Sequence, residues 1–235
     1  MVYNKELVLQ KISEERIKFA TVSGVLTTKP GIIEWVDREI PEIEIITTKS
    51  YQVRPNAGHR EPIIVEADCG CFGNAVGLRN PGMEQGAAEL RELRRRRELR
   101  ALLNVSLSAS SPEDFAELIR NFEEVADLLE LNFSCPHAAD GYGSSIGASE
   151  ELVWKYISIV RGVTEKPLFV KLTPNVDDIG SIARAAVEAG ADGITAINTV
   201  GPELYIEPYT GEPVLSNPRG HKGGKSGVWI RETAL

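Results

Sequence analysis

The sequence has few cysteines, few histidines and no long apolar run. Its 235 residues include three cysteines, Cys69, Cys71 and Cys135, an odd number that fits a reducing compartment better than a disulfide scaffold. No stretch has the apolar length of a membrane span, and residues 1–20 are charged and amphipathic, unlike a secretion signal. We therefore expect a cytoplasmic protein without a membrane segment.

Several site motifs are also absent. The three histidines, His59, His137 and His221, share no metal-ligand spacing, and the Cys-x-Cys pair lacks the ligand pattern of a zinc site, so no metal site is expected. There is no G-x-S-x-G elbow and no dinucleotide fingerprint after the first expected strand. The net charge of −8 argues against nucleic-acid binding, and the basic run at 91–100 has the spacing of an exposed, charge-laced helix.

Apolar β-type runs alternate with helical patterns along the chain. Strands are expected at 17–22, 43–48, 101–108, 126–134, 166–173 and 192–198, with a short additional strand at 62–68. Helices are expected from Pro30, at 87–100, from a Ser111 cap, at 150–162 and at 178–190, the last closed by a glycine. Residues 220–227, GHKGGKSG, are predicted as a loop before a helix start at 228–235. Strict alternation predicts a parallel sheet, either doubly wound or a (β/α)₈ barrel.

The polar residues at the expected strand ends favour the barrel. They are Ser23, Lys49, Asn104, Asn132, Lys171 and Asn198. In a barrel such ends converge on one mouth, where active sites are built, whereas in an open sheet they spread along a line. We predict one barrel domain over 1–235 that lacks its last two strand–helix units. Either the chain is a fragment, or a partner or a rearrangement closes the sheet; bare edge strands make a homo-oligomer the expected state.

Residues 129–137, LELNFSCPH, place reactive side chains at the end of a buried strand. Asn132 and Ser134 share one face of the strand, and Cys135 begins the following loop. A thiol tuned by a neighbouring cation suits a general base that removes a proton from a carbon acid. A small buried cysteine is the alternative.

Other candidate ligand contacts lie at the same mouth. Burying the ammonium groups of Lys49 and Lys171 at the mouth is unfavourable unless each meets an anion or an electron-rich ring. The alternative is that both lysines extend to the surface. Asn74 lies in a glycine-rich turn, GNAVGLRNPG, whose amide groups can cradle a carboxylate. Asn198 and Thr199 offer an amide and a hydroxyl to a planar, amide-rich ring.

At LELNFSCPH, at VKLTPNVDDIGSIARAAVEAGADGITAINTV (170–200) and at GGKSG (223–227), the sequence resembles the dihydroorotate dehydrogenase family. It is also similar to the pyrimidine-reducing domain of dihydropyrimidine dehydrogenase. The resemblance runs from about residue 20 to the end. It implies a (β/α)₈ barrel with FMN at its mouth that oxidises dihydroorotate to orotate in pyrimidine biosynthesis.

The resemblance also implies roles for individual residues. Cys135 would take the C5 proton of the dihydropyrimidine, and flavin N5 would accept the C6 hydride. The implied substrate-binding residues are Lys49, Asn74, Gly77, Leu78, Asn132, Asn198 and Thr199. The implied flavin-binding residues are Ser23, Lys49, Ser50, Asn104, Asn132, Lys171, Ile197 and Gly227. A cysteine base is typical of the soluble branches of the family, whereas the membrane-associated branch uses a serine.

Two departures from the family pattern define the alternatives. His137 in SCPH stands where dihydroorotate dehydrogenases usually carry Asn, so a dihydrouracil or thymine dehydrogenase is one alternative. TTKS and NAVGL-x-NPG, which include the carboxylate cradle, favour dihydroorotate. The family's C-terminal quarter, which grips the FMN phosphate, is missing, so a non-catalytic barrel fragment is the other alternative. The electron acceptor stays open among fumarate, a quinone, and NAD through an iron–sulfur partner subunit.

Overall fold

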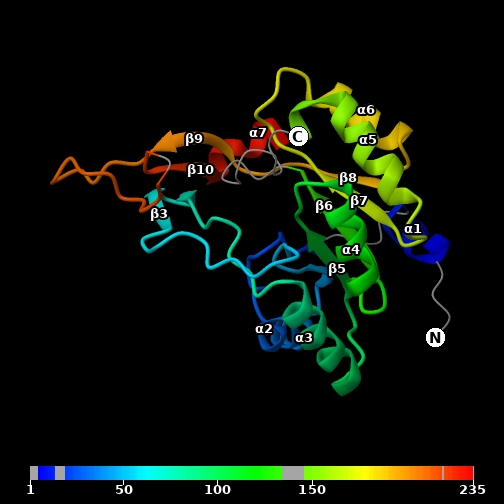
Figure 1. Cartoon of the computed structure of the whole chain (residues 1–235). Helices are drawn as coiled ribbons and strands as arrows, with labels where there is room; N and C mark the ends of the chain where they lie inside the picture. Colours follow the sequence, from blue (N-terminus) through cyan, green and yellow to red (C-terminus); the bar gives the residue numbers. More distant parts are fainter. Residues whose placement is uncertain (1–4, 14–18, 134–145, 219, 235) are drawn as a thin grey trace.

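The computed structural model describes residues 5–13, 19–133, 146–218 and 220–234 (Figure 1). Its larger sheet has six strands, all parallel, that follow one another in sequence order. They are β1 (Phe19–Ala20), β2 (Ile43–Thr47), β5 (Leu102–Leu107), β6 (Leu128–Asn132), β7 (Leu168–Lys171) and β8 (Gly193–Thr195). A doubly wound sheet would reverse its strand order, and this one does not.

The helices that connect these strands form one layer along the outside of the sheet. They are α2 (Pro30–Glu39), α3 (Met83–Arg96), α4 (Pro112–Phe122), α5 (Glu150–Arg161) and α6 (Ile179–Glu188), and each contacts the next. A short helix, α1 (Lys5–Ser13), precedes the sheet, and a 3₁₀ turn, η1 (Ile146–Ala148), precedes α5. Sequential parallel strands under one layer of helices make a curled part of a (β/α)₈ barrel, which confirms the predicted fold class. The single-domain boundary of 1–235 stays a prediction.

Local sequence signals start and stop several helices as predicted. The hydroxyl of Ser111 accepts the amide N–H of Asp114 at 3.1 Å, and Pro112 occupies the first turn of α4. Gly190 follows α6 with a φ of +108°, the left-handed conformation that a helix-ending glycine adopts without a steric penalty. The helix predicted at 87–100 instead ends at Arg96. Arg97 is extended, and its guanidinium reaches the buried carboxylate of Asp37 at 2.8 Å.

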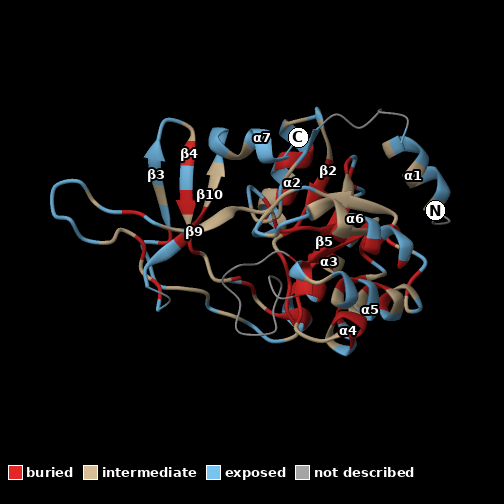
Figure 2. Cartoon of the chain, turned by 90° about the horizontal axis from the view of Figure 1, so that it is seen from above, coloured by how far each residue is buried: buried red, intermediate tan, exposed pale blue. Residues whose placement is uncertain are grey.

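The hydrophobic core lies between the helices and the outer face of the parallel sheet (Figure 2). Strand residues alternate between the two faces. Leu103, Val105, Leu129, Leu131 and Val170 pack against α3, α4 and α5, whose buried residues belong to the same cluster. The residues between them face the inside of the curled sheet. That inner face is polar; it carries Asn104, Ser106, Glu130, Asn132, Lys171 and Thr195.

A second, antiparallel sheet stands beside the mouth of the curled sheet (Figure 1). Its order is β3 (Ile64–Asp68), β4 (Cys71–Asn74), β10 (Lys222–Gly227) and β9 (Val200–Leu204). β3 falls within the short strand expected at 62–68. The prediction of a loop at 220–227 is wrong, because most of this segment forms β10, which pairs with β4 and β9. A turn, η2 (Val228–Ile230), and a short helix, α7 (Arg231–Ala234), follow where a helix start was predicted.

The described residues contain neither a membrane-spanning helix nor a cluster of metal ligands. No helix in the ranges given above is long and apolar enough to cross a membrane. No cluster of three or more His, Cys, Asp or Glu side chains in the same ranges is arranged to hold a metal ion.

Candidate active site

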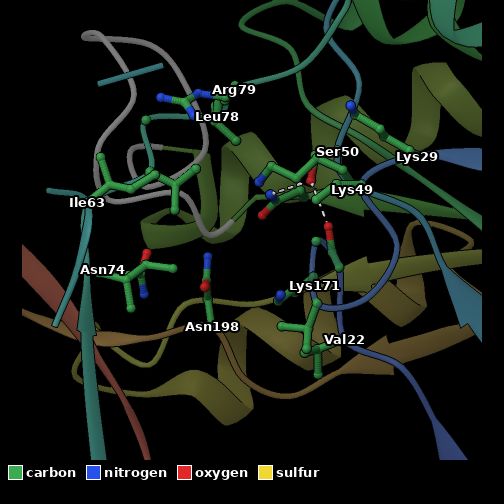
Figure 3. A pocket seen from close by; sticks show the side chains of 18 of the residues that line it. Val22, Lys29, Lys49, Ser50, Ile63, Asn74, Leu78, Arg79, Lys171 and Asn198 are labelled. Atoms are coloured by element: carbon green, nitrogen blue, oxygen red, sulfur yellow. Dashed lines mark hydrogen bonds between the residues drawn. The ribbon is translucent and has the colours of Figure 1, made fainter. Parts of the chain in front are cut away.

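A cavity of about 1640 Å³ lies at the carboxyl ends of the parallel strands, facing the antiparallel sheet (Figure 3). Asn74 reaches it from β4, and Lys171 reaches it from the end of β7. Most of the predicted site residues line it: Ser23, Lys49, Ser50, Asn74, Gly77, Leu78, Asn132, Lys171, Ile197, Asn198, Thr199 and Gly227. Residues separated by as many as 204 positions, Ser23 and Gly227, are therefore brought to one site. The predicted roles of these residues stay predictions.

Two of the predicted residues are not among those that line the cavity. Cys135, the expected base, lies outside the described residues. Asn104 was placed at a strand end, but it is the third residue of β5, which continues to Leu107. Its amide donates to the Thr47 hydroxyl at 3.2 Å, and its buried side-chain oxygen has no hydrogen-bond partner among the described residues. The strand position therefore sets Asn104 too deep inside the curled sheet to reach the cavity wall.

Lys171 brings a buried positive charge to the cavity. Neighbouring β6 and β7 set Asn132 beside Lys171 in register, and both point to the inner face. The Lys171 side chain is only 8% exposed, and no hydrogen bond or ion pair joins its ammonium group to another described residue. A buried ammonium is stable only with an acceptor or an anion nearby. The site therefore has an unmet requirement for an electron-rich ligand group.

Serine hydroxyls connect the cavity wall to the interior of the sheet. The Ser50 hydroxyl lies 3.2 Å from that of Ser23 and 2.9 Å from that of Ser106, and it accepts the Asn132 amide N–H at 3.0 Å. Ser50 itself is buried. This network fixes the positions of Ser23 and Asn132 at the wall, and Figure 3 shows its dashed bonds around Ser50.

The turn after β4 presents backbone amides to the cavity. Gly77 and Leu78 both adopt the left-handed conformation, with φ of +72° and +55°. A side chain on Gly77 would lie 2.9 Å from the His59 ring, so glycine is required there by space as well as by conformation. Among the described residues, no acceptor meets the N–H groups of Gly77 and Leu78. Such a turn of unpaired amides binds anions.

Polar contacts behind the turn hold it in place. The Asn80 amide donates to the carbonyl of Leu78 at 2.7 Å and to Gln52 at 2.9 Å, while its oxygen accepts the N–H of Gly82 at 2.9 Å. The ring of His59 bonds the carbonyl of Ala75 at 2.9 Å. The cradle is therefore preformed without a ligand.

The opposite wall follows β8. The Asn198 N–H donates to the carbonyl of Leu172 at 3.0 Å, and the Asn198 side-chain oxygen accepts the N–H of Thr199 at 2.8 Å. Asn175 bonds the Thr199 carbonyl at 3.3 Å. The side chain of Thr199 lies against the backbone of Gly224, where any side chain would collide with it. The glycines of β10 thus let the two sheets close around the cavity.

Sequence reasoning missed several residues that line the cavity. Arg79 lies at the variable position of NAVGL-x-NPG, and its guanidinium donates to the carbonyls of Ala57 at 2.8 Å and His59 at 2.9 Å. Its place in the motif was the available signal. Lys29 and Arg96 also line the cavity but carry no motif that would have identified them. With Lys49 and Lys171 these side chains outnumber the two glutamates of the lining, Glu89 and Glu92.

Comparisons with known proteins identify the family of this chain. The family model described as dihydroorotate dehydrogenase matches residues 18–235. The chain belongs to the dihydroorotate dehydrogenase family. The match begins close to residue 20, where the sequence resemblance was expected to begin.

Curated relatives carry the same family name. The chain is 44% identical over 190 residues to the "dihydroorotate dehydrogenase B (NAD(+)), catalytic subunit" of Methanothermobacter thermautotrophicus, covering 81% of this chain and 60% of the relative. It is 43% identical over 213 residues to the protein of that name from Pyrococcus abyssi, covering 91% of this chain and 67% of the relative. The chain therefore spans about three fifths to two thirds of these relatives' length.

A solved structure supports the fold. The ligand-free dihydroorotate dehydrogenase of Eimeria tenella superposes with a TM-score of 0.71 at 18% identity, covering 92% of this chain and 66% of that one. At this identity the likeness is evidence for the fold alone, and it agrees with the curled barrel described above.

Proposed function

We propose that this chain carries the dihydroorotate-oxidising site of a flavin-dependent dihydroorotate dehydrogenase, with FMN as cofactor. The observation that carries the proposal is the cavity at the strand ends, where the predicted flavin and substrate contacts converge. Membership of the dihydroorotate dehydrogenase family supports it, since that family is one of flavin-dependent oxidoreductases that act on CH–CH bonds.

The residues at the inner end of the cavity fit a flavin ring. Lys171 offers a buried ammonium without a partner among the described residues, and a flavin's pyrimidine carbonyls are suitable acceptors. Ser23, Ser50 and Asn132 offer hydroxyl and amide groups beside it. A flavin bound here would supply the acceptor for the hydride on C6 of the substrate. Lys49 and Gly227 complete the proposed flavin contacts.

The outer end fits the substrate. The amides of Gly77 and Leu78, which meet no acceptor among the described residues, and the ammonium of Lys49 line the same cavity, and they suit the carboxylate that distinguishes dihydroorotate from dihydrouracil. Asn74 and Asn198 approach from the two sheets and suit the amide edges of a dihydropyrimidine ring. This cradle favours dihydroorotate over the uncharged alternatives.

Cys135 is proposed as the base that takes the proton from C5. It follows Asn132, the last residue of β6, by three positions in the sequence, and Asn132 lines the cavity. A positioned base contributes on the order of 10²- to 10⁴-fold to such a proton transfer.

The electron acceptor is proposed from the relatives' names. The matched proteins are called catalytic subunits of an NAD(+) enzyme, so we propose that a separate electron-transfer subunit passes electrons from this chain to NAD. The expected homo-oligomer and cytoplasmic location stay predictions.

An anaerobic visible spectrum of the chain with FMN tests the proposal. Dihydroorotate should bleach the bound flavin, and dihydrouracil should not. Cys135→Ala should keep flavin binding and slow bleaching by about 10²- to 10⁴-fold. Bleaching by dihydrouracil alone would favour the dihydropyrimidine alternative. Failure to bind FMN, or an unaltered rate in Cys135→Ala, would contradict the proposal.

A further inference from the structure

A buried carboxylate lies on the inner face of the curled sheet, below the cavity. Glu130, in the middle of β6, is 2% exposed and does not line the cavity. Its two oxygens are each occupied by a hydroxyl. Ser106 donates to Oε1 at 3.0 Å, and Thr195 donates to Oε2 at 3.0 Å. The proposed chemistry does not use this group, yet a buried carboxylate costs too much to serve as filler.

The carboxylate sets the direction of the hydrogen bonds that link it, through Ser106 and Ser50, to the cavity wall. A serine hydroxyl has one proton to donate. Ser106 gives its proton to Glu130, so across the 2.9 Å contact with Ser50 it must accept. Ser50 has thereby used its own proton, so it must accept from its two other neighbours, the hydroxyl of Ser23 at 3.2 Å and the amide of Asn132 at 3.0 Å.

The direction of these bonds decides what the cavity offers to a ligand. Ser23 has given its proton to Ser50, so only its lone pairs remain for a bound molecule. Asn132 must turn its amide nitrogen, not its oxygen, toward Ser50, which fixes how the amide is presented at the wall. A neutral side chain in place of the carboxylate would remove this constraint on the Ser106 and Ser50 hydroxyls, because hydroxyls can reverse.

We propose that Glu130 is a positioning residue that acts through Ser106 and Ser50 to make Ser23 an obligatory acceptor and to fix the orientation of Asn132. The wall is thereby selective for a planar heterocycle with an N–H or O–H group on the edge that meets Ser23. That the heterocycle is a flavin rests on the proposed function; the direction of the bonds does not.

Two matched variants test the ligand side. Ser106→Ala leaves the Ser50 proton without its acceptor, so that proton turns toward Ser23 or reverses Asn132. Thr195→Val removes the other hydroxyl on the same carboxylate but leaves the path to the cavity intact. Both lose one hydrogen bond to Glu130, and Ser106→Ala also loses the bond from Ser50, so the unfolding temperature without ligand should fall in both variants and somewhat further in Ser106→Ala.

FMN titration, followed by flavin fluorescence and by the visible band of the bound flavin, separates the two variants. Ser106→Ala should weaken FMN binding by about ten- to a hundredfold and shift the visible band, because Ser23 would no longer be held as an acceptor for the ligand. Thr195→Val should stay within about two- to threefold of the wild type with the same band. Equal effects of the two variants, or no effect of Ser106→Ala, would overturn the proposal.

A neutron structure of the deuterated, ligand-free chain tests the bond directions themselves. The deuteron of Ser106 should point to Glu130, that of Ser50 to Ser106, and that of Ser23 to Ser50. A reversed Ser106 or Ser50 deuteron would overturn the proposal whether or not FMN binds. A wild-type chain that does not bind FMN would instead count against the proposed function, and the neutron map would still decide the direction.

Discussion

Replacing Lys171 with Met should have opposite effects on stability and on flavin binding. The ammonium of Lys171 is buried at the cavity without a partner among the described residues. Methionine has a similar length and no charge to desolvate. Because the cavity admits some water, we expect the ligand-free variant to gain only about 1 kcal/mol, or about 2–4 °C in Tm.

The loss in binding should be larger than that gain. A hydrogen bond from a charged donor contributes about 1.5–3 kcal/mol, which corresponds to about a ten- to 150-fold weaker flavin affinity in Lys171→Met. At a flavin concentration of about 100 times the wild-type Kd, the wild type gains about 2.7 kcal/mol of stability from the ligand. A variant with a hundredfold weaker affinity gains only about 0.4 kcal/mol. Thermal unfolding with and without FMN measures both quantities.

Lys166→Met is the matched control. Its ammonium donates to the carbonyl of Ala126 at 2.7 Å, away from the cavity, and burial lowers the pKa of this lysine. Burial disfavours the charge of Lys166, whereas its hydrogen bond to Ala126 favours it, so Lys166→Met should change stability by less than about 1 kcal/mol and leave flavin affinity unchanged. The reasoning on Lys171 would be refuted if Lys171→Met bound FMN as tightly as the wild type, or if it lost stability.

Three further predictions concern the framework of the site. Gly73→Ala should lower the free energy of unfolding, measured in urea, by about 1–3 kcal/mol, because its side chain would collide with the Tyr205 ring. The control is Gly31→Ala, at a helical position with open space, which should raise that free energy by about 0.5–1 kcal/mol. Burial, with a smaller contribution from a nearby glutamate, raises the pKa of Tyr205 to about 12. Because the folded state favours the neutral phenol, this contribution to the free energy of unfolding is fully present below about pH 10. It is lost as the pH rises from about 10 toward 12. Tyr205→Phe, which also removes a buried hydroxyl that has no hydrogen-bond partner among the described residues, should remove the part of the alkaline loss that is due to Tyr205 in a pH series of unfolding curves. The part due to Tyr51, whose pKa burial also raises, should remain. Asp37→Ala should cost about 3 kcal/mol, since it strips a fully buried carboxylate from Arg97, and a loss under 1 kcal/mol would contradict this account.

The parallel strands and their helices could be predicted because their signals are local. Apolar alternation, the Ser111 cap and the glycine after α6 each lie within a few residues of the feature they specify. The antiparallel sheet had no such signal. β10 is largely glycine, lysine and serine, and it becomes a strand by pairing Gly224 with Asn74, far away in the sequence. Long-range pairing of this kind cannot be inferred from local pattern.

The part of the candidate site that lies at the ends of the parallel strands could be predicted from the sequence. Asn132 and Lys171 are the last residues of β6 and β7, so the rule that active sites gather at the carboxyl ends of barrel strands placed them correctly at the cavity. Asn104 shows the limit of that rule. It shares the inner face, but each further residue along a strand adds about 3.3 Å, and Asn104 lies three residues before the end of β5.

Glu130 marks the point where local sequence rules fail for a physical reason. A leucine-rich strand that is buried on both faces is not expected to contain a carboxylate, so the hydrophobic pattern alone gives no reason for Glu130. Its two hydroxyl partners come from β5 and β8, and only the curled sheet brings them to it. A residue that violates the local sequence pattern, but whose hydrogen-bonding groups are all satisfied in the fold, is typical of functional sites. Glu130 lies beneath the cavity wall and is linked through Ser106 to Ser50, which contacts both Ser23 and Asn132, so a role in presenting ligand contacts is the better explanation.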